Sequence, residues 1–212
     1  ILGFVKMAVP SMTESQQSDV LDVVEELYLR FGFVDGDAAS LYLNDYVIVR
    51  DGRIVNSSYK RKMPKLSDFL DLMNLLVLDG TFPQLSDIYK TMTPYYASKT
   101  RGLFDTYTPD ELRNLRDVPV INFDISALES SEVRTLAMYV LLSWIWEKFG
   151  KKNPQLRKRI IVDEAWMMMS PSFAGYEHSS SFLENMSRRI RKRNGALCVA
   201  SQKIEDFSST VK

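Results

Sequence analysis

The sequence predicts an α/β protein with a parallel sheet in its second half and a mainly helical lobe in its first half. Apolar residues recur at helical spacing through most of residues 1–116. Residues 117–212 instead alternate between short runs rich in β-branched residues and longer helical stretches. Strand–helix–strand alternation is typical of parallel strands joined by right-handed crossovers. We therefore divide the chain into a helical lobe, 1–116, and a core segment, 117–212.

The composition indicates a globular protein and argues against several classes of partner and site. The 212 residues are 45% hydrophobic, which is enough to bury a core. Lys and Arg number 27, as do Asp and Glu, so the net charge of zero gives no general attraction to nucleic acid or to an anionic membrane. A single cysteine and a single histidine exclude an internal disulfide and argue against a structural zinc site, which suits a cytoplasmic protein. We expect Cys198 to be inert core and His178 to lie in a surface loop.

The first half shows helix boundaries and one hairpin. Thr13-Glu14-Ser15-Gln16 is a capping-box pattern, and the helix that follows is expected to end at Gly32. Asp51-Gly52 between two short apolar runs predicts a β-hairpin. A second helix begins after Pro64 and ends at Asp79-Gly80. Shorter helical pieces are expected over residues 85–92 and 109–115.

The second half is predicted to contain three strands separated by two helices. The strands are expected at 118–125, 160–162 and 196–200, and the helices at 132–149 and 181–193. The carboxyl ends of parallel strands meet at one edge of a sheet, where ligands bind. Asp124, the pair Asp163-Glu164 and Gln202 would therefore lie along that edge.

The run Ile160-Ile161-Val162-Asp163-Glu164 has the form of a Walker B element, a fully buried strand that delivers two acids to its carboxyl end. Asp163 would hold a nucleotide-bound Mg²⁺, usually through water. Glu164 would polarise or deprotonate the attacking water. Many strands end in acids merely because acids are soluble turn residues, so the motif needs support from its surroundings.

Two further features suit phosphoryl transfer. Gln202 ends the next strand, 38 residues after Glu164, where a polar side chain can sense the γ-phosphate; the alternative is a glutamine that begins a loop. The preceding helix has five basic residues at 188–193. An arginine among them could reach a nucleotide bound to a neighbouring subunit. The alternatives are a solvated basic face and, ranked last because the run is short and lacks aromatics, a DNA-facing patch.

These motifs together resemble the large traffic ATPases of conjugation and type IV secretion systems. The resemblance rests on Asp163-Glu164-Ala165-Trp166, on Arg191-Lys192 followed by Gly195, and on Ser201-Gln202. Four upstream segments extend it over nearly the whole chain: residues 13–31, Pro64-Lys65-Leu66-Ser67-Asp68, Gly102-Leu103-Phe104-Asp105 and Val120-Ile121-Asn122-Phe123-Asp124.

The resemblance implies a RecA-like P-loop NTPase core in which the helical lobe is inserted, with ATP and Mg²⁺ as ligands. It implies that Asp163 serves Mg²⁺, Glu164 activates water, Gln202 senses phosphate and Arg191 is an arginine finger. It also implies a hexameric motor that works with other subunits of a secretion system. Such a motor lies on the cytoplasmic face of the inner membrane and powers substrate transfer or pilus assembly.

One element of the family pattern is missing. No stretch matches Gly-x-x-x-x-Gly-Lys-Ser/Thr, the loop that cradles nucleotide phosphates. We therefore expect a fragment of a longer protein that carries this loop before Ile1, and we expect the fragment alone to be inactive. Two alternatives stay open: a related RecA-like DNA-translocating ATPase, and a non-catalytic docking module whose helical lobe binds secretion partners.

Overall fold

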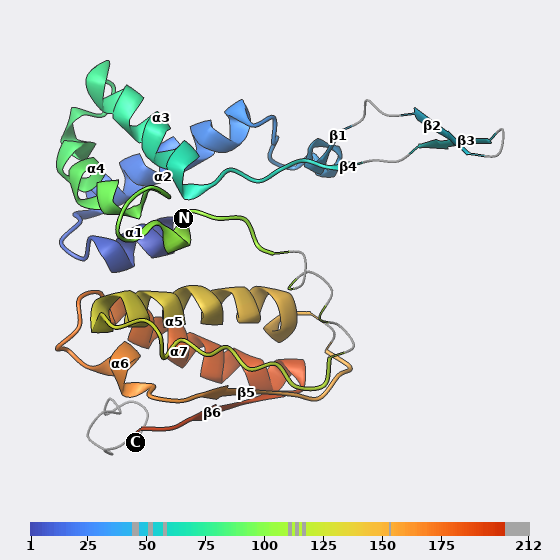
Figure 1. Ribbon diagram of the computed structural model, residues 1–212, viewed down its shortest axis with the longest axis vertical. Coiled ribbons are helices and arrows are strands. Elements are labelled where there is room, and N and C mark those ends of the chain that lie inside the picture. Colours follow the sequence, from blue (N-terminus) through green and yellow to red (C-terminus); the bar gives the residue numbers. More distant parts are fainter. Residues whose placement is uncertain are drawn as a thin grey trace. The chain divides into compact units, whose positions relative to one another are not determined.

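The structure is a computed structural model that describes residues 1–43, 47–50, 53–56, 59–109, 112, 115, 118–152 and 154–201. The chain divides into two compact units (Figure 1). One comprises Ile1–Leu2 and Thr13–Asp110, and the other comprises Gly3–Met12 and Glu111–Lys212. Most of helix α1 (Leu2–Ala8) thus belongs with the second half of the chain, which a single division at residue 116 does not anticipate.

The predicted capping box begins helix α2 (Glu14–Arg30). The Thr13 hydroxyl accepts a hydrogen bond from the Gln16 backbone N–H at 3.2 Å, and the Gln16 side chain accepts one from the Thr13 N–H at 3.0 Å. This reciprocal arrangement satisfies N–H groups that a helix start leaves without partners. Val20, Val23 and Leu27 form the buried stripe of the helix. The prediction for this helix is confirmed.

Helices α3 (Leu66–Leu78) and α4 (Ser86–Met92) follow α2 in this unit. The single-turn helix η1 (Ala38–Leu41) precedes α3, η2 (Pro83–Leu85) lies between α3 and α4, and η3 (Thr93–Tyr95) and η4 (Gly102–Phe104) follow α4. A buried acid connects the start of α3 to a later loop. One oxygen of Asp105 accepts the Ser67 N–H at 2.9 Å, and the other accepts the Ala97 N–H at 3.1 Å. The side chain that the sequence places in a family motif therefore acts as a structural acceptor.

The strands of the first unit are short and antiparallel. β1 (Tyr42–Leu43) pairs with β4 (Tyr59–Lys60), and β2 (Val47–Arg50) pairs with β3 (Arg53–Asn56). The β2–β3 pairing confirms the predicted hairpin, while its turn, Asp51-Gly52, lies outside the described residues. Most of the helix predicted at 109–115 also lies outside them.

The second unit contains helix α5 (Ser131–Ile145), whose last turn continues as a π-helix, η6 (Trp146–Gly150). Glycine is required at position 150 because a Cβ there would overlap the ring of Trp146. Leu136, Met138 and Leu142 are buried, as expected of an apolar helix. Among the helices that the structure describes, none is both long and apolar enough to cross a bilayer.

Parallel pairing joins β5 (Lys158–Val162) to β6 (Gly195–Val199), with Lys158 opposite Gly195 and Val162 opposite Val199. Between these strands the chain forms α6 (Trp166–Met169), α7 (Tyr176–Ile190) and the single turn η7 (Arg191–Arg193). Figure 1 shows α5 and α7 on the same side of the two strands. The α/β class and the parallel sheet are confirmed.

Only one face of the β5–β6 pair is buried, contrary to the expectation of a fully buried strand. Ile160 and Val162 are buried, whereas Ile161 between them is 69% exposed. Cys198, expected in the core, is exposed as well, because alternate residues of a strand point to opposite faces and α5 and α7 cover only one of them.

The strand expected at 118–125 does not form. The structure assigns these residues no strand, and Val120 is 80% exposed. Asp124 begins a turn instead of ending a strand, since its carboxylate accepts the Ser126 N–H at 2.9 Å. A β-rich composition favours a pleated surface only where a neighbouring strand supplies ladder hydrogen bonds. Within the described part of the chain, this segment has no such neighbour.

Replacing Asp105 tests its role in the first unit. Asp105→Ala would leave the N–H groups of Ser67 and Ala97 without an acceptor, and we expect the free energy of unfolding to fall by about 2–3 kcal/mol in urea titrations. Asp87→Ala removes an acid from an exposed ion pair with Lys90 and serves as the control, with an expected loss under about 0.5 kcal/mol. Equal losses in the two variants would contradict the assignment.

Candidate active site

The candidate site is the acid pair Asp163-Glu164 at the carboxyl end of β5. Both acids are exposed, and both follow directly from the last residue of the strand, Val162. The chain beyond them is tied to the end of β6. The Ala200 N–H donates to the Val162 carbonyl at 2.9 Å, and the Ala165 N–H donates to the Ala200 carbonyl at 3.0 Å. The parallel pairing thus continues past both strands and holds the acids at the sheet edge.

Glu164 has a left-handed backbone conformation, with φ of 50°. A residue with a Cβ adopts this region at a cost of about 1–3 kcal/mol, and such residues cluster at functional sites. One oxygen of Asp163 accepts the Glu164 N–H at 2.9 Å and stabilises the turn. The turn explains how two consecutive acids, which would point to opposite faces in a strand, come to share one edge.

Trp166 positions the Glu164 carboxylate. The indole N–H of Trp166 donates to Glu164 Oε2, and the indole ring packs against Phe173 with 5.5 Å between ring centroids. The other carboxylate oxygen, Oε1, has no protein donor recorded among the described residues. The sequence indicated Trp166 only as part of the family resemblance. A tryptophan two residues after the second acid could also have predicted this contact, because that spacing brings the indole N–H close to the carboxylate.

The two acids fit a magnesium ion of the kind that accompanies a nucleotide. Mg²⁺ is bound by one or two carboxylates together with water and phosphate oxygens. The structure shows no group of three or more His, Cys, Asp or Glu side chains among its described residues that could hold a metal by themselves. Asp163 keeps one carboxylate oxygen beyond its bond to the Glu164 N–H. The acid pair therefore suits a shared ion and not an all-protein cage.

The structure does not bring Arg191 to the acid pair. Arg191 lies in η7, just before β6 begins, and is exposed. Strands rise about 3.3 Å per residue, so the five residues of β5 separate Arg191 from the acids by roughly 15 Å. Within one chain the two groups cannot contact the same phosphate. Gln202, the other predicted catalytic residue, lies outside the described residues.

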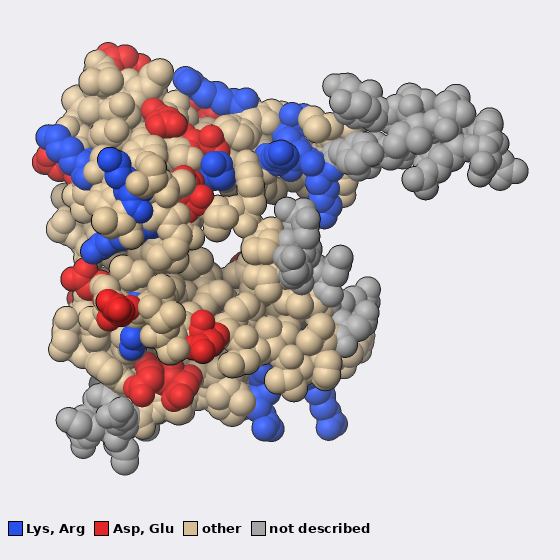
Figure 2. Space-filling view, in the orientation of Figure 1, with Lys and Arg blue, Asp and Glu red and all other residues tan. Residues whose placement is uncertain are grey.

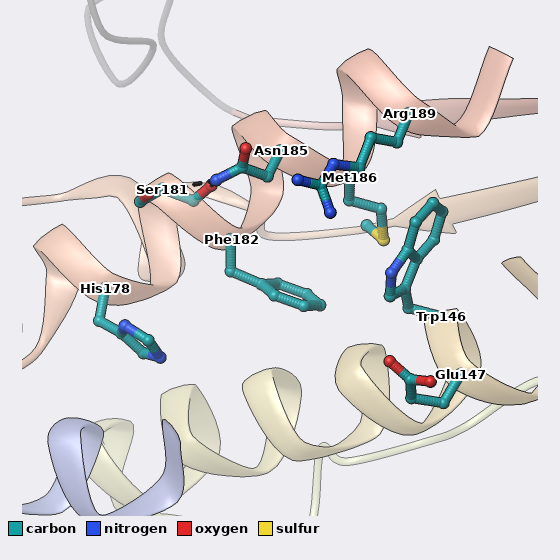
Figure 3. Close-up of a pocket in the computed structure, with 8 residues that line it drawn as sticks. All are labelled: Trp146, Glu147, His178, Ser181, Phe182, Asn185, Met186 and Arg189. Carbon is teal, nitrogen blue, oxygen red and sulfur yellow. Dashed lines mark hydrogen bonds between the residues drawn. The ribbon is translucent and has the colours of Figure 1, made fainter. Parts of the chain in front are cut away.

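A pocket of about 290 Å³ lies between the end of α5 and α7, and it contains neither acid (Figure 3). Its lining includes Trp146, Phe182 and Met186, with Glu147 and Arg189 among its polar residues. Figure 3 shows the Phe182 ring projecting from α7 toward α5. Polar side chains make up the rest of the lining: Glu147, His178, Ser181, Asn185 and Arg189.

His178 borders this pocket and is not the loop residue that the sequence suggested. It lies in the first turns of α7, half-buried, with Nε2 2.9 Å from the Tyr139 hydroxyl. Burial lowers the pKa of His178 below its usual value, and the nearby charge of Lys6 lowers it further. The serines around it in sequence are helical, and one of them, Ser179, is fully buried with its hydroxyl donating to the Met168 carbonyl.

Comparison with protein-family models gives no match, and no curated protein sequence matches the chain. A search of solved structures finds VirB4 of Thermoanaerobacter pseudethanolicus, with a TM-score of 0.64 and 20% sequence identity. The match covers 97% of this chain and 49% of that one, so the chain spans about half the length of the VirB4 structure. At this identity the likeness shows the fold, and it confirms the predicted fold class over both units.

Substituting glycine for Glu164 tests the backbone strain. Glu164→Gly removes the Cβ that disfavours positive φ, which relieves about 1–3 kcal/mol, and also the acceptor of the Trp166 indole N–H, which costs about 0.5–1.5 kcal/mol, so we expect the free energy of unfolding to rise by about 0.5–1 kcal/mol. Glu177→Gly is the matched control, because Glu177 is an exposed acid in the first turn of α7, where glycine costs about 1 kcal/mol. Urea titration of both variants measures the difference. A stability loss in Glu164→Gly equal to that of the control would contradict the strain.

The half-buried His178 predicts a pH dependence of stability. Its folded-state pKa lies below the unfolded value near 6.5, so the unfolded chain binds more protons in the window just below pH 6.5. We expect the free energy of unfolding to fall as the pH drops from 7 toward 5, and His178→Gln to flatten this part of the curve. His178 is the only histidine in the sequence, so the difference between the two curves isolates its titration. Parallel curves would show that His178 does not contribute.

Proposed function

We propose that this chain is part of an ATP-hydrolysing motor of a type IV secretion or conjugation system. The observation that supports the proposal most is the acid pair itself. Asp163 and Glu164 lie at the carboxyl end of a parallel strand, and the second acid adopts a strained turn that a mere solubilising residue would not need. The likeness in fold to VirB4 agrees with this proposal.

In the proposed mechanism the two acids have different tasks. Asp163 would hold the Mg²⁺ that accompanies a nucleotide, and the Glu164 N–H, which donates to its Oδ1, fixes the orientation of its carboxylate. Glu164 accepts a proton from the attacking water through Oε1, because the Trp166 indole occupies Oε2 and fixes the orientation of the carboxylate. ATP with its Mg²⁺ supplies the phosphoryl group and neutralises its charge when bound.

Binding of ATP requires residues that this sequence does not contain. No stretch of the 212 residues has the Gly-rich pattern and the following Lys that cradle the phosphates. We therefore propose that the chain hydrolyses ATP only as part of a longer protein, and that it is inactive alone. The match to half of the VirB4 chain is consistent with this division of labour.

Arg191 and Gln202 complete the proposal. The roughly 15 Å between Arg191 and the acids supports a role in a neighbouring subunit's site, as an arginine finger in a hexamer or another ring. Gln202 is proposed to sense the γ-phosphate. We further propose that the motor lies on the cytoplasmic face of the inner membrane with other secretion subunits and powers substrate transfer or pilus assembly.

The test is Mg²⁺-dependent ATP hydrolysis by the whole protein that contains this chain. Glu164→Gln keeps the size of the side chain and its acceptor for Trp166 but removes the base, so we expect kcat to fall about 10²–10⁴-fold while ATP binding is retained. Glu177→Gln is the control, an exposed acid of the same type for which we expect unchanged turnover.

Two outcomes would contradict parts of the proposal. Equal turnover in wild type and Glu164→Gln would show that Glu164 is not the base. Absence of hydrolysis in both proteins would favour a docking module that binds secretion partners without turnover. Hydrolysis that rises strongly on adding DNA would instead favour a DNA-translocating ATPase of the same structural class.

A further inference from the structure

Two basic runs meet at the end of the sheet where β5 and β6 begin. One comprises residues 148–152 and 154–159, which connect α5 to β5 and enter that strand, and the other comprises residues 188–193, which end α7 and form η7. We term these residues together the basic edge. It contains eleven Lys and Arg, all exposed except Lys158, which is partly buried.

The tertiary structure, not the sequence, brings the two runs together. Arg193 Nη1 donates to the Lys151 carbonyl at 3.5 Å, and the Lys158 N–H donates to the Asn194 carbonyl at 3.2 Å. The parallel register adds to these bonds by placing Arg159 opposite Ala196. The run at 188–193 is too short by itself to track a polyanion. Joined to the connector, it becomes one side of a larger surface.

Little acidic charge offsets the basic edge. Lys151 pairs with Glu147, and Arg188 pairs with Glu184. Burial lowers the pKa of Lys158, and repulsion from Arg193 lowers it further, as expected where cations crowd together. In the unit that contains β5 and β6, Figure 2 shows blue side chains projecting at the end where the strands begin. The net charge of the whole chain is zero and therefore gives no sign of this local positive charge.

We propose that the basic edge binds the sugar–phosphate backbone of a nucleic acid. Six of its eleven cations are arginines, whose planar guanidinium groups bind phosphate through two hydrogen bonds. None of its described residues is an exposed aromatic that could stack on a base. The basic edge would therefore contact phosphates and not bases. We expect it to bind double-stranded nucleic acid at least as tightly as single-stranded nucleic acid.

The same surface is poorly built for a membrane. Interfacial binding needs an apolar face that sinks into the headgroup region. The apolar stripe of α7, formed by Leu183, Met186 and Ile190, is buried in the core instead. Leu156, at 54% exposed, is the one large hydrophobic side chain exposed among the described residues of the basic edge. The basic edge could therefore contact lipid only through its charge. Charge is sufficient to bind the phosphate backbone of a nucleic acid.

The basic edge and the acid pair occupy opposite ends of the same strands. Nucleic acid bound where the strands begin would leave Asp163 and Glu164 accessible, roughly 15 Å away. The proposal therefore stands apart from ATP hydrolysis and can be tested without nucleotide. Substitutions in the connector and β5 also leave Arg191, the proposed arginine finger, untouched.

The test is fluorescence anisotropy of a labelled 30-base-pair duplex of arbitrary sequence, titrated with the protein at several salt concentrations. We expect the logarithm of the binding constant to fall linearly with the logarithm of salt concentration. Lys152→Gln/Arg157→Gln/Arg159→Gln removes three exposed cations and should weaken binding at 50 mM salt about 10–100-fold. It should also reduce the salt slope by about 2–3, since each phosphate contact contributes about 0.9.

The matched control is Lys62→Gln/Lys90→Gln/Lys99→Gln, which removes the same charge from three exposed lysines of the other unit. We expect its affinity to stay within twofold of wild type, with circular dichroism confirming that both variants fold. Equal weakening in the two variants would show attraction by net charge alone and overturn the proposal. Binding to phosphatidylglycerol vesicles without binding to nucleic acid would overturn it as well and assign the surface to lipid.

Discussion

The parallel pairing of β5 with β6 is the constraint on which the rest of the second unit depends. It continues beyond both strands, because the Ala200 N–H reaches Val162 and the Ala165 N–H reaches Ala200. These bonds hold the chain after Val162 at the sheet edge, where Asp163 and Glu164 turn. Since parallel strands begin at one edge and end at the other, the same pairing gathers the acids at one end and the cations at the opposite end.

The buried acid and the two exposed acids have different roles in this protein. Asp105 is buried, and each of its oxygens accepts a backbone N–H, so it serves the fold and is closed to a ligand from solvent. Asp163 and Glu164 are exposed, and each gives one recorded oxygen to the protein. These contacts orient the two carboxylates and leave acceptor oxygens exposed to solvent. That is the arrangement a metal ligand and a general base require.

Lys158 supports the backbone of the basic edge through its own hydrogen bonds. Lys158 Nζ donates to the carbonyls of Phe149 at 2.9 Å and Lys152 at 2.5 Å, so its charge secures the connector between α5 and β5. The cations on either side of it remain at the surface. A partly buried lysine among exposed ones thus shapes the surface that its neighbours present, because it ties the connector to the start of β5.

Local patterns in the sequence determined much of the fold: the capping box before α2, the helix after Pro64, the pairing of β2 with β3, and a strand ending in two acids. These features depend on neighbours within a few residues, so they can be predicted from the chain alone. Only the tertiary structure decided that residues 118–125 form no strand, that Cys198 and Ile161 are exposed, that His178 contacts Tyr139, and that two separate basic runs meet. Strand formation, burial and patches depend on which distant segment lies alongside, and a one-dimensional pattern does not specify that partner.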